Sequence, residues 1–354
     1  MNRMYPLELT PRLVEAIWGG EALVSRYGKS GDPSAKLGES WECWTENPIA
    51  AGAAAGKRLG EVMRVMGPAL IGLTPLEDKQ TFPVLTKIID AHLSLSVQVH
   101  PTDAYARAHE GQPNGKTECW VILEAASGAE LIFGFAKKTD AAEYRRRVAD
   151  GSLGDILRRV PAKKGDVFHI PAGTLHSIGA GIVLFETQQS SDLTYRIFDW
   201  NRVGADGKAR ELQIDKAADV LDFRESDRAA VQPLTYRLFG AERSLLVADT
   251  RFGVEEITLT ARSRYLIESV ATLFMAEGQE IEMRAGDENL TLRPWQTYLL
   301  PAGFDRAELW SRESGAKLLV VTPPGADERA RRRLELAGID PARIASFLAQ
   351  FADR

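Results

Sequence analysis

The sequence predicts a mainly β protein with two successive β domains, a small helical insertion in the first domain and a helical C-terminal tail. Three observations support this fold class. Short apolar runs bounded by Gly, Asp or Pro recur from Thr81 to about Thr322. The 354 residues exceed one ordinary hydrophobic core. The segment after Pro323-Pro-Gly325 has helical patterning. Strands at this spacing are typical of sandwiches or closed barrels rather than βαβ units.

The first domain is expected to cover residues 1–235. Its N-terminal part mixes short helices with strands, because residues 11–18 are predicted as a short helix or turn and residues 59–73 as a helix that stops before Thr74-Pro75. The β pattern follows this helix. Short strands are predicted, in order, at residues 82–90, 93–100, 117–123, 129–135, 165–171, 181–189 and 194–200.

A helical insertion interrupts this β block at about residues 139–160. Thr139 can cap a helix over residues 140–148. Residues 153–160 also have apolar side chains at helical spacing, so a second helix is expected there.

The remainder of the chain divides into three parts. Residues 203–235 are polar and are interpreted as a connector. A second β domain is expected at residues 236–324, where short strands again alternate with Gly, Asp and Pro. The tail, residues 325–354, is predicted to form two helical segments separated by Gly338 and Pro341.

Composition and charge narrow the functional classes. The net charge is -5 and the isoelectric point about 5.7, which argues against a broad nucleic-acid-binding surface. No signal-peptide pattern is visible, and no window approaches the ~20 apolar residues of a membrane span. The two cysteines, Cys43 and Cys119, have neither metal-site nor CxxC spacing. We therefore expect a soluble, cytoplasmic protein with reduced thiols and with no nucleic-acid or membrane partner.

The strand predicted at residues 93–100 carries the first functional candidates. Alternate side chains of a strand share a face, so Gln98 and His100 lie together on a polar face with Ser94 and Ser96. A carbonyl oxygen and an imidazole side by side can bind a metal ion. Taken alone, a Gln-x-His pair is more often a hydrogen-bonded pair on a solvated face.

A second pattern lies at residues 165–176. There a strand ends at Pro171-Ala-Gly173, and His176 enters the next strand. Proline cannot donate to a ladder and glycine permits positive φ, so this turn can direct His176 inward at a barrel mouth. The pattern resembles the second characteristic motif of the cupins, which implies jelly-roll barrels. His169 lies within the motif, but we expect it to be packed or at the surface.

The second β block repeats the cupin turn at Pro301-Ala-Gly303. Two cupin barrels are therefore expected. The position that holds a histidine in the first barrel is Arg306 in the second, and all five histidines precede residue 177. The second barrel is expected to bind no metal ion and to serve in packing.

A third candidate is Glu118, an oxygen ligand at the start of the strand after Gly115. Taken together, six motifs in order resemble class I mannose-6-phosphate isomerases, especially their short bacterial form. The resemblance covers residues 5–202 well and the rest loosely. The motifs are Gly38–Glu42, Phe82–Asp90, Leu95–Pro101, Gly115–Trp120, Pro171–His176 and Glu186–Arg196.

The resemblance implies a metal site and a reaction. One divalent ion, usually zinc, is held by Gln98, His100, Glu118 and His176. Two nitrogen and two oxygen ligands suit zinc, although iron, manganese, cobalt and nickel also fit. Because a glutamine carbonyl is a weak ligand, an open position for water or substrate is expected. The implied reaction interconverts mannose 6-phosphate and fructose 6-phosphate, which requires a base and an electrophile for an enediolate.

Candidate catalytic residues follow from the strand at 181–189 and from the metal ligands. Glu186 departs from an otherwise apolar face, where burial can raise a carboxyl pKa toward that of a useful base. A buried glutamate paired to a structural arginine is the alternative. In the family, the positions of Asp192 and Arg196 border the sugar site, and Arg196 is the candidate for stabilising the enediolate. Lys116 must lie near the metal because it is two residues from Glu118.

Further residues are candidates for binding substrate. Lys87 lies within an apolar strand, which is costly unless it points into a polar cavity. The alternative is a surface or ion-paired lysine. No Gly-rich phosphate loop is present, so the phosphate requires side-chain cations. The candidates for this role are Arg202, Lys36 and Arg196. Candidate sugar-stacking residues, for which core packing is the commoner role, are Trp18, Trp41 and Tyr105.

Two other functions stay open at this point. A non-catalytic cupin that binds sugar phosphates would have lost a metal ligand or Arg196, whereas this sequence has all the expected ligands and Arg196. An iron cupin oxygenase would usually have three histidines, or two histidines and a carboxylate. The Gln98 ligand and the cations Lys116 and Arg196 argue against an oxygenase. The expected partner is a small sugar phosphate, and the expected state is a monomer or homodimer.

Overall fold

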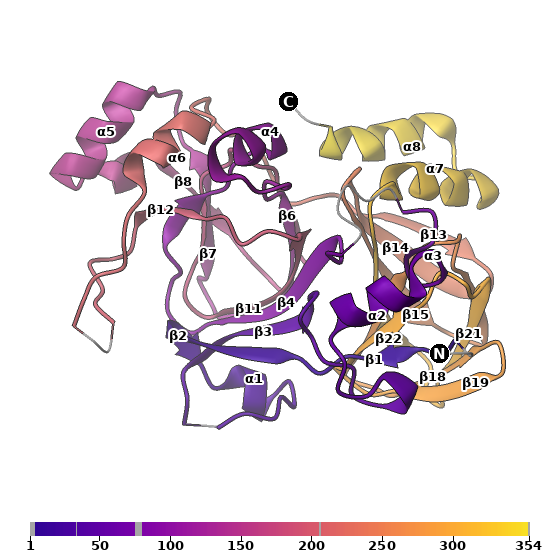
Figure 1. The fold of residues 1–354 in the computed structure, drawn as a ribbon. Coiled ribbons are helices and arrows are strands. Elements are labelled where there is room, and N and C mark those ends of the chain that lie inside the picture. The colour runs from indigo at the N-terminus through magenta and orange to yellow at the C-terminus, as the bar shows by residue number, and fades with distance from the viewer. Residues whose placement is uncertain (1–3, 33, 75–79, 205–206, 353–354) are drawn as a thin grey trace. The chain divides into compact units, whose positions relative to one another are not determined.

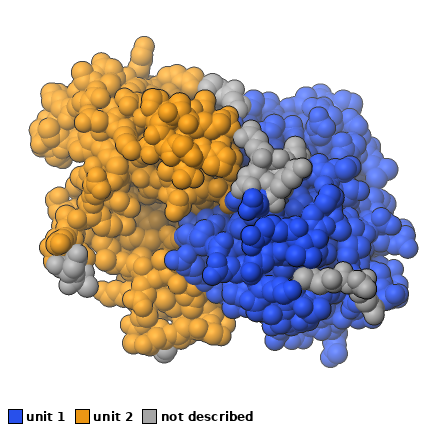
Figure 2. Space-filling view, viewed as in Figure 1, with its two compact units in different colours: residues 1–12, 41–87, 231–354 blue, residues 13–40, 88–230 orange. Residues whose placement is uncertain are grey.

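The computed structural model describes residues 4–32, 34–74, 80–204 and 207–352. They form a mainly β fold of two compact units (Figures 1 and 2). Unit 1 comprises residues 1–12, 41–87 and 231–354, and unit 2 comprises residues 13–40 and 88–230. These limits differ from the contiguous domains expected from the sequence at residues 1–235, 236–324 and 325–354, and that division stays a prediction.

Unit 2 is built on two sheets, and residues 12, 41–43 and 84–87 of their strands belong to unit 1. One has the strand order β2-β3-β4-β11-β6-β9 and the other the order β12-β5-β10-β7-β8. Side chains from both sheets, including Trp120, Phe133 and Phe168, meet in one hydrophobic core. The strands are β2 Arg12–Gly20, β3 Leu37–Cys43, β4 Val84–Ala91, β5 Val97–Val99, β6 Glu118–Ala125, β7 Glu130–Phe135, β8 Leu157–Pro161, β9 Val167–Ile170, β10 His176–Ile178, β11 Ile182–Gln189 and β12 Tyr195–Phe198.

Two sheets around a shared core are the arrangement of a jelly roll. Within the described parts of the chain, no strand ladder joins the two sheets into a closed barrel. Helices α5 and α6 pack against each other beside the five-stranded sheet (Figure 1). The helical segments of unit 2 are α1 Ala22–Ser25, α4 Asp103–Tyr105, the π-helix η2 Ala106–Glu110, α5 Ala141–Asp150, the 3-10 turn η3 Leu153–Ile156 and α6 Ile214–Val220.

Unit 1 also has two sheets, with the orders β1-β20-β17-β22-β15-β14-β13 and β16-β21-β18-β19. Its core includes Tyr265, Phe274 and Leu309. The strands are β1 Leu7–Glu8, β13 Leu234–Leu238, β14 Ala241–Ala248, β15 Gly253–Leu259, β16 Ser263–Leu266, β17 Thr272–Glu277, β18 Ile281–Ala285, β19 Glu288–Leu292, β20 Thr297–Leu300, β21 Arg306–Trp310 and β22 Ala316–Thr322. The helices are η1 Gly52–Ala54, α2 Leu59–Met66, α3 Pro68–Ile71, α7 Ala326–Leu336, α8 Pro341–Leu348 and η4 Ala349–Phe351.

The predicted helical tail is confirmed by α7 and α8, but two helix predictions are wrong. Residues 12–18 of this segment lie in strand β2, where a side chain at Gly19 would meet the Gly38 nitrogen at 2.5 Å. Sheet pairing therefore overrides the local helical spacing. Residues 153–160 form the short turn η3 and then strand β8, which pairs with β7.

Three smaller differences also concern the helices. The helix expected at 59–73 divides into α2 and α3 at Gly67, whose φ is 50°. Helix α5 is capped by Asp140, which accepts hydrogen bonds from two backbone N–H groups, and not by Thr139. The connector contains helix α6. None of the helices in the described residues is long and apolar enough to cross a membrane.

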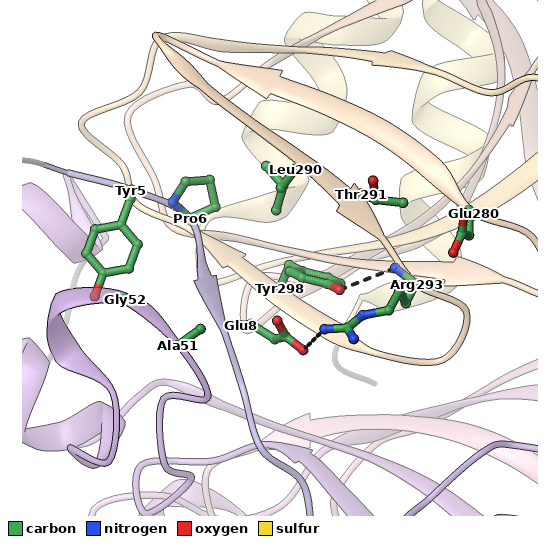
Figure 3. Close-up of a pocket in the computed structure, with 10 residues that line it drawn as sticks. All are labelled: Tyr5, Pro6, Glu8, Ala51, Gly52, Glu280, Leu290, Thr291, Arg293 and Tyr298. Atoms are coloured by element: carbon green, nitrogen blue, oxygen red, sulfur yellow. Dashed lines mark hydrogen bonds and ion pairs between the residues drawn. The ribbon is translucent and has the colours of Figure 1, made fainter.

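Unit 1 contains a pocket of about 410 Å³ beside strand β1 (Figure 3). Glu8 pairs with Arg293 at 2.7 Å, and the hydroxyl of Tyr298 accepts the Arg293 backbone N–H at 3.3 Å. Tyr5 and Leu290 also line it. The pocket contains none of the predicted catalytic or metal-binding residues.

Candidate metal centre and substrate site

Three buried side chains, each on or next to a different strand of unit 2, converge on one point. His100 directly follows β5, Glu118 begins β6 and His176 begins β10. Their ligand atoms all lie within 4.8 Å of one another. The Nε2 atoms of His100 and His176 are each 3.3 Å from a Glu118 carboxylate oxygen. This cluster is able to hold one metal ion.

Backbone carbonyls orient both histidines. Nδ1 of His100 lies 2.8 Å from the Leu193 carbonyl oxygen, and Nδ1 of His176 lies 2.8 Å from that of Thr174. A carbonyl only accepts, so each Nδ1 carries the proton and each Nε2 keeps its lone pair. Burial lowers the pKa of His100 to about 3, assisted by the charge of Lys116. Burial likewise lowers the pKa of His176, so both rings are neutral, as metal binding requires.

Glu118 supplies a negative charge to the cluster. Its side chain is fully buried, and its Oε2 forms an ion pair with the Lys116 ammonium. Burial alone would raise the pKa of Glu118, but the charge of Lys116 and the neighbouring histidines hold it well below its usual range. A charged carboxylate between two neutral imidazoles suits a divalent cation such as zinc. The residues present therefore fit the expected metal.

Lys116 contacts this centre directly. Its Nζ lies 2.8 Å from Glu118 Oε2 and 3.2 Å from His100 Nε2. The lysine is buried. The expectation from sequence that Lys116 lies beside the metal ligands therefore agrees with its position, and its role in proton transfer stays a prediction.

Gln98 lies beside His176 across the β5–β10 ladder. Its Nε2 is 3.3 Å from His176 Nε2, and its Oε1 accepts a hydrogen bond from Ser96 at 3.2 Å. Turning the amide by 180° exchanges its oxygen and nitrogen. The position therefore suits a fourth, oxygen ligand, and that role stays a prediction.

Arg196 faces the same side of the sheet as these residues. It is the register partner of Gln98 in the β5–β12 ladder, and directly opposed residues project to one face. Its Nε donates to the Ser96 hydroxyl at 3.3 Å. Asp192 is exposed and precedes Leu193, whose carbonyl binds His100. Arg196 thus neighbours Gln98 in the sheet, and Asp192 is next in the chain to the residue whose carbonyl orients His100.

Glu186 lies within the core side of β11 and is buried. Its Oε2 accepts a hydrogen bond from Trp120 Nε1 at 3.0 Å. The Trp120 ring also contacts the His176 ring, with centroids 5.5 Å apart. Trp120 therefore links Glu186 to a metal ligand. Sequence reasoning assigned Trp120 no role, although its place two residues after Glu118 puts it on the same face.

Other predicted substrate residues have different surroundings. Lys87 is buried in unit 1, with Nζ 5.1 Å from the Trp41 ring centroid. Trp18 is buried in the hydrophobic core of unit 2, a place that favours packing over sugar stacking. Arg202 donates to Asp199 at 2.5 Å. Their substrate contacts stay predictions.

The remaining candidates are polar or packed residues. Lys36 is exposed. The hydroxyl of Tyr105 donates to Asp219 at 3.2 Å, and its ring stacks on His109 with centroids 4.2 Å apart. His169 is buried and lies opposite Cys119, on the other face from Glu118. This explains why His169 does not join the cluster.

Comparison with known proteins gives a consistent result. The family model of the phosphomannose isomerase type I catalytic domain matches residues 7–126. A Bacillus subtilis protein named as a probable mannose-6-phosphate isomerase, GmuF, is 35% identical over 313 residues, which cover 85% of this chain and 94% of that protein.

Solved structures show the same fold. The crystal structure of the mannose 6-phosphate isomerase from Bacillus subtilis matches with a TM-score of 0.82 and 29% identity, over 90% of this chain and 99% of that one. A zinc-bound mannose 6-phosphate isomerase matches with a TM-score of 0.71 at 15% identity, over 91% of this chain and 100% of that one. With these matches and the buried histidine–glutamate centre, the chain belongs to the type I phosphomannose isomerase family, within the cupin superfamily.

Proposed function

We propose that this protein interconverts mannose 6-phosphate and fructose 6-phosphate with one zinc ion held by His100, Glu118, His176 and Gln98. The observation that carries the proposal is the buried cluster of two neutral imidazoles and one charged carboxylate. Zinc is the metal named for a structural relative. A sugar-binding protein without activity and an iron oxygenase are not favoured, since the matched relatives are isomerases.

The reaction moves a proton between two carbons of the open sugar. A base takes the proton from C2, and the C2–H electrons form the C1–C2 double bond while the C1 carbonyl oxygen gains a proton. Return of a proton to C1 and loss of the C2 hydroxyl proton give the ketose. The bound metal ion supplies Lewis-acid polarisation of the substrate oxygens.

The protein residues divide this work between them. Lys116 and Glu186 are the proposed holders of the moving proton, and Lys116 contacts a metal ligand directly. Arg196 stabilises the developing negative charge from its place opposite Gln98. Asp192 borders the sugar. The proposed substrate contacts are Lys87, Arg202 and Trp18.

Location and assembly are also proposed. The two cysteines are buried and free, which suits a reducing compartment such as the cytoplasm. A monomer or homodimer is the proposed state, and sedimentation equilibrium distinguishes the two.

The decisive experiment measures isomerisation before chelation, after chelation and after restoration of zinc. Activity that disappears with the chelator and returns with zinc supports both the reaction and the cofactor. A metal-replete protein that converts no mannose 6-phosphate contradicts the proposal.

A further inference from the structure

Asp199, at the end of β12, binds two arginines at once. Its carboxylate accepts hydrogen bonds from Arg202 Nη2 at 2.5 Å, and from Arg210 Nε and Nη2 at 2.8 and 2.6 Å. The Asp199 side chain is 6% exposed, whereas those of Arg202 and Arg210 are 16% and 31% exposed. The carboxylate thus fixes two guanidinium groups that solvent and solutes can reach.

A third guanidinium group lies close by. Burial lowers the pKa of Arg196, and the charges of Arg210 and Arg202 add to this effect while Asp199 opposes it. Two of these arginines share the Asp199 carboxylate, and Arg196 adds a third positive charge nearby, so the three arginines and Asp199 together carry two excess positive charges. In the described residues no second carboxylate forms an ion pair with any of the three arginines. Partly buried excess charge is unfavourable unless a counter-ion binds.

The arginines adjoin the metal centre along one stretch of chain. Arg196 lies opposite Gln98, and its Nε donates to Ser96. Arg202 Nη1 donates to the Ser94 carbonyl at 2.6 Å. Four residues of extended chain, from Ser94 to Gln98, span at most about 13 Å. A sugar phosphate has its carbonyl carbon at one end and its phosphate at the other, so one molecule can reach from the metal centre toward the arginines.

We propose that Arg210, together with Arg202, binds the phosphate dianion of the substrate, and that Asp199 is the residue that positions these two arginines. A phosphate monoester carries about -1.5 to -2 charges at pH 7, which matches the unpaired positive charge. Guanidinium groups bind such oxygens in pairs, through parallel N–H donors. This inference rests on the proposed function for the identity of the substrate. Arg210 lies outside every motif of the sequence.

The test combines binding of inorganic phosphate, measured by calorimetry on the zinc-loaded chain, with kinetics on mannose 6-phosphate. R210A is expected to weaken phosphate binding and to raise KM roughly tenfold or more, with kcat little changed, because a charge-assisted contact is lost. R210K keeps the charge but not the fork and should fall between wild type and R210A. D199N should also raise KM, since it loosens both arginines.

R224A is the matched control. Arg224 forms the same kind of fork with Asp222, at 2.8 and 2.7 Å, on an exposed part of unit 2. Its phosphate affinity and KM should equal those of the wild type. The thermal midpoints of all variants show whether a loss of phosphate binding reflects unfolding. If R210A is unfolded, R210K is compared with the wild type instead.

The two proposals fail in different ways. Phosphate binding that depends on Arg210, without conversion of mannose 6-phosphate, overturns the isomerase assignment and supports the anion site. Conversion with unchanged KM and unchanged phosphate affinity in both R210A and R210K overturns the anion site and leaves the isomerase intact.

Discussion

Trp120 and Glu186 are register partners on β6 and β11, and the indole Nε1 donates to the carboxylate Oε2 at 3.0 Å. The same indole packs against His176. One aromatic side chain therefore contacts both Glu186, a proposed catalytic residue, and His176, a proposed metal ligand. The hydrogen bond ties the buried Glu186 to Trp120, so Glu186 can serve either as a base or as an anchor for Trp120.

E186Q separates these two roles. The amide oxygen can still accept the Trp120 N–H, so the free energy of unfolding and the zinc content should change little. If Glu186 holds the moving proton, kcat should fall about 10²-fold or more, because a neutral amide cannot act as a base. Steady-state kinetics and metal analysis check this. A kcat equal to that of the wild type would assign the proton to Lys116 instead.

H176A should release the metal and abolish turnover. The fully buried imidazole is one of the four proposed metal ligands, and its loss also leaves a cavity. H169A is the control, since His169 is equally a buried histidine but lies on the opposite face of the sheet. Metal content by mass spectrometry should be near zero in H176A and unchanged in H169A. Retained zinc in H176A contradicts the ligand assignment.

The strand pattern and the turns at Pro171 and Pro301 could be read from the sequence, because alternation and turn chemistry are local. The pairing of Gln98 with Arg196, from strands far apart in the chain, could not, because register depends on tertiary contacts. The family resemblance brought these residues together instead. The prediction of a short helix or turn at residues 11–18 failed for the same reason, because the strand conformation of β2 depends on its pairing with β3.

R196A should lower kcat about 10²-fold without loss of zinc, since Arg196 is proposed to act on developing charge. R306A is the control, because Arg306 is exposed in unit 1 at the corresponding turn of the second β unit. Rates are measured at saturating mannose 6-phosphate, and zinc is measured on the same samples. An R196A enzyme with the wild-type rate would remove this arginine from the mechanism.

A buried charge cluster in unit 1 supports a prediction about stability. Glu255 pairs with Arg243 at 3.3 Å and with Arg333 of helix α7 at 3.5 Å, and it also accepts a hydrogen bond from Tyr236. R243M leaves a buried carboxylate with fewer partners, so it should lower the free energy of unfolding by about 3–5 kcal/mol. The double variant R243M/E255M should recover part of this loss. Urea unfolding checks it, and strictly additive losses contradict the coupling.

The metal-free protein should lose stability as the pH falls below about 6.5. The pKa of His100 is lowered to about 3 in the folded state, chiefly by burial, whereas an unfolded histidine titrates near 6.5. Between these values the unfolded chain binds a proton that the folded chain does not, so unfolding is favoured. The contribution of His100 is complete above pH 6.5 and is lost progressively toward pH 3. At pH 5 the loss from this one group amounts to about 2 kcal/mol.

Urea unfolding of chelated protein at pH 7.5 and pH 5 measures this difference. H100Q removes the group, so its stability should fall less between the two pH values than that of the wild type. The remaining titratable groups, including the carboxylates, are present in both proteins. Their contribution to the pH dependence of stability therefore cancels when the two proteins are compared. Equal losses in wild type and H100Q would mean that His100 takes up its proton while the chain is still folded. In that case the buried imidazole would not be held neutral by the fold.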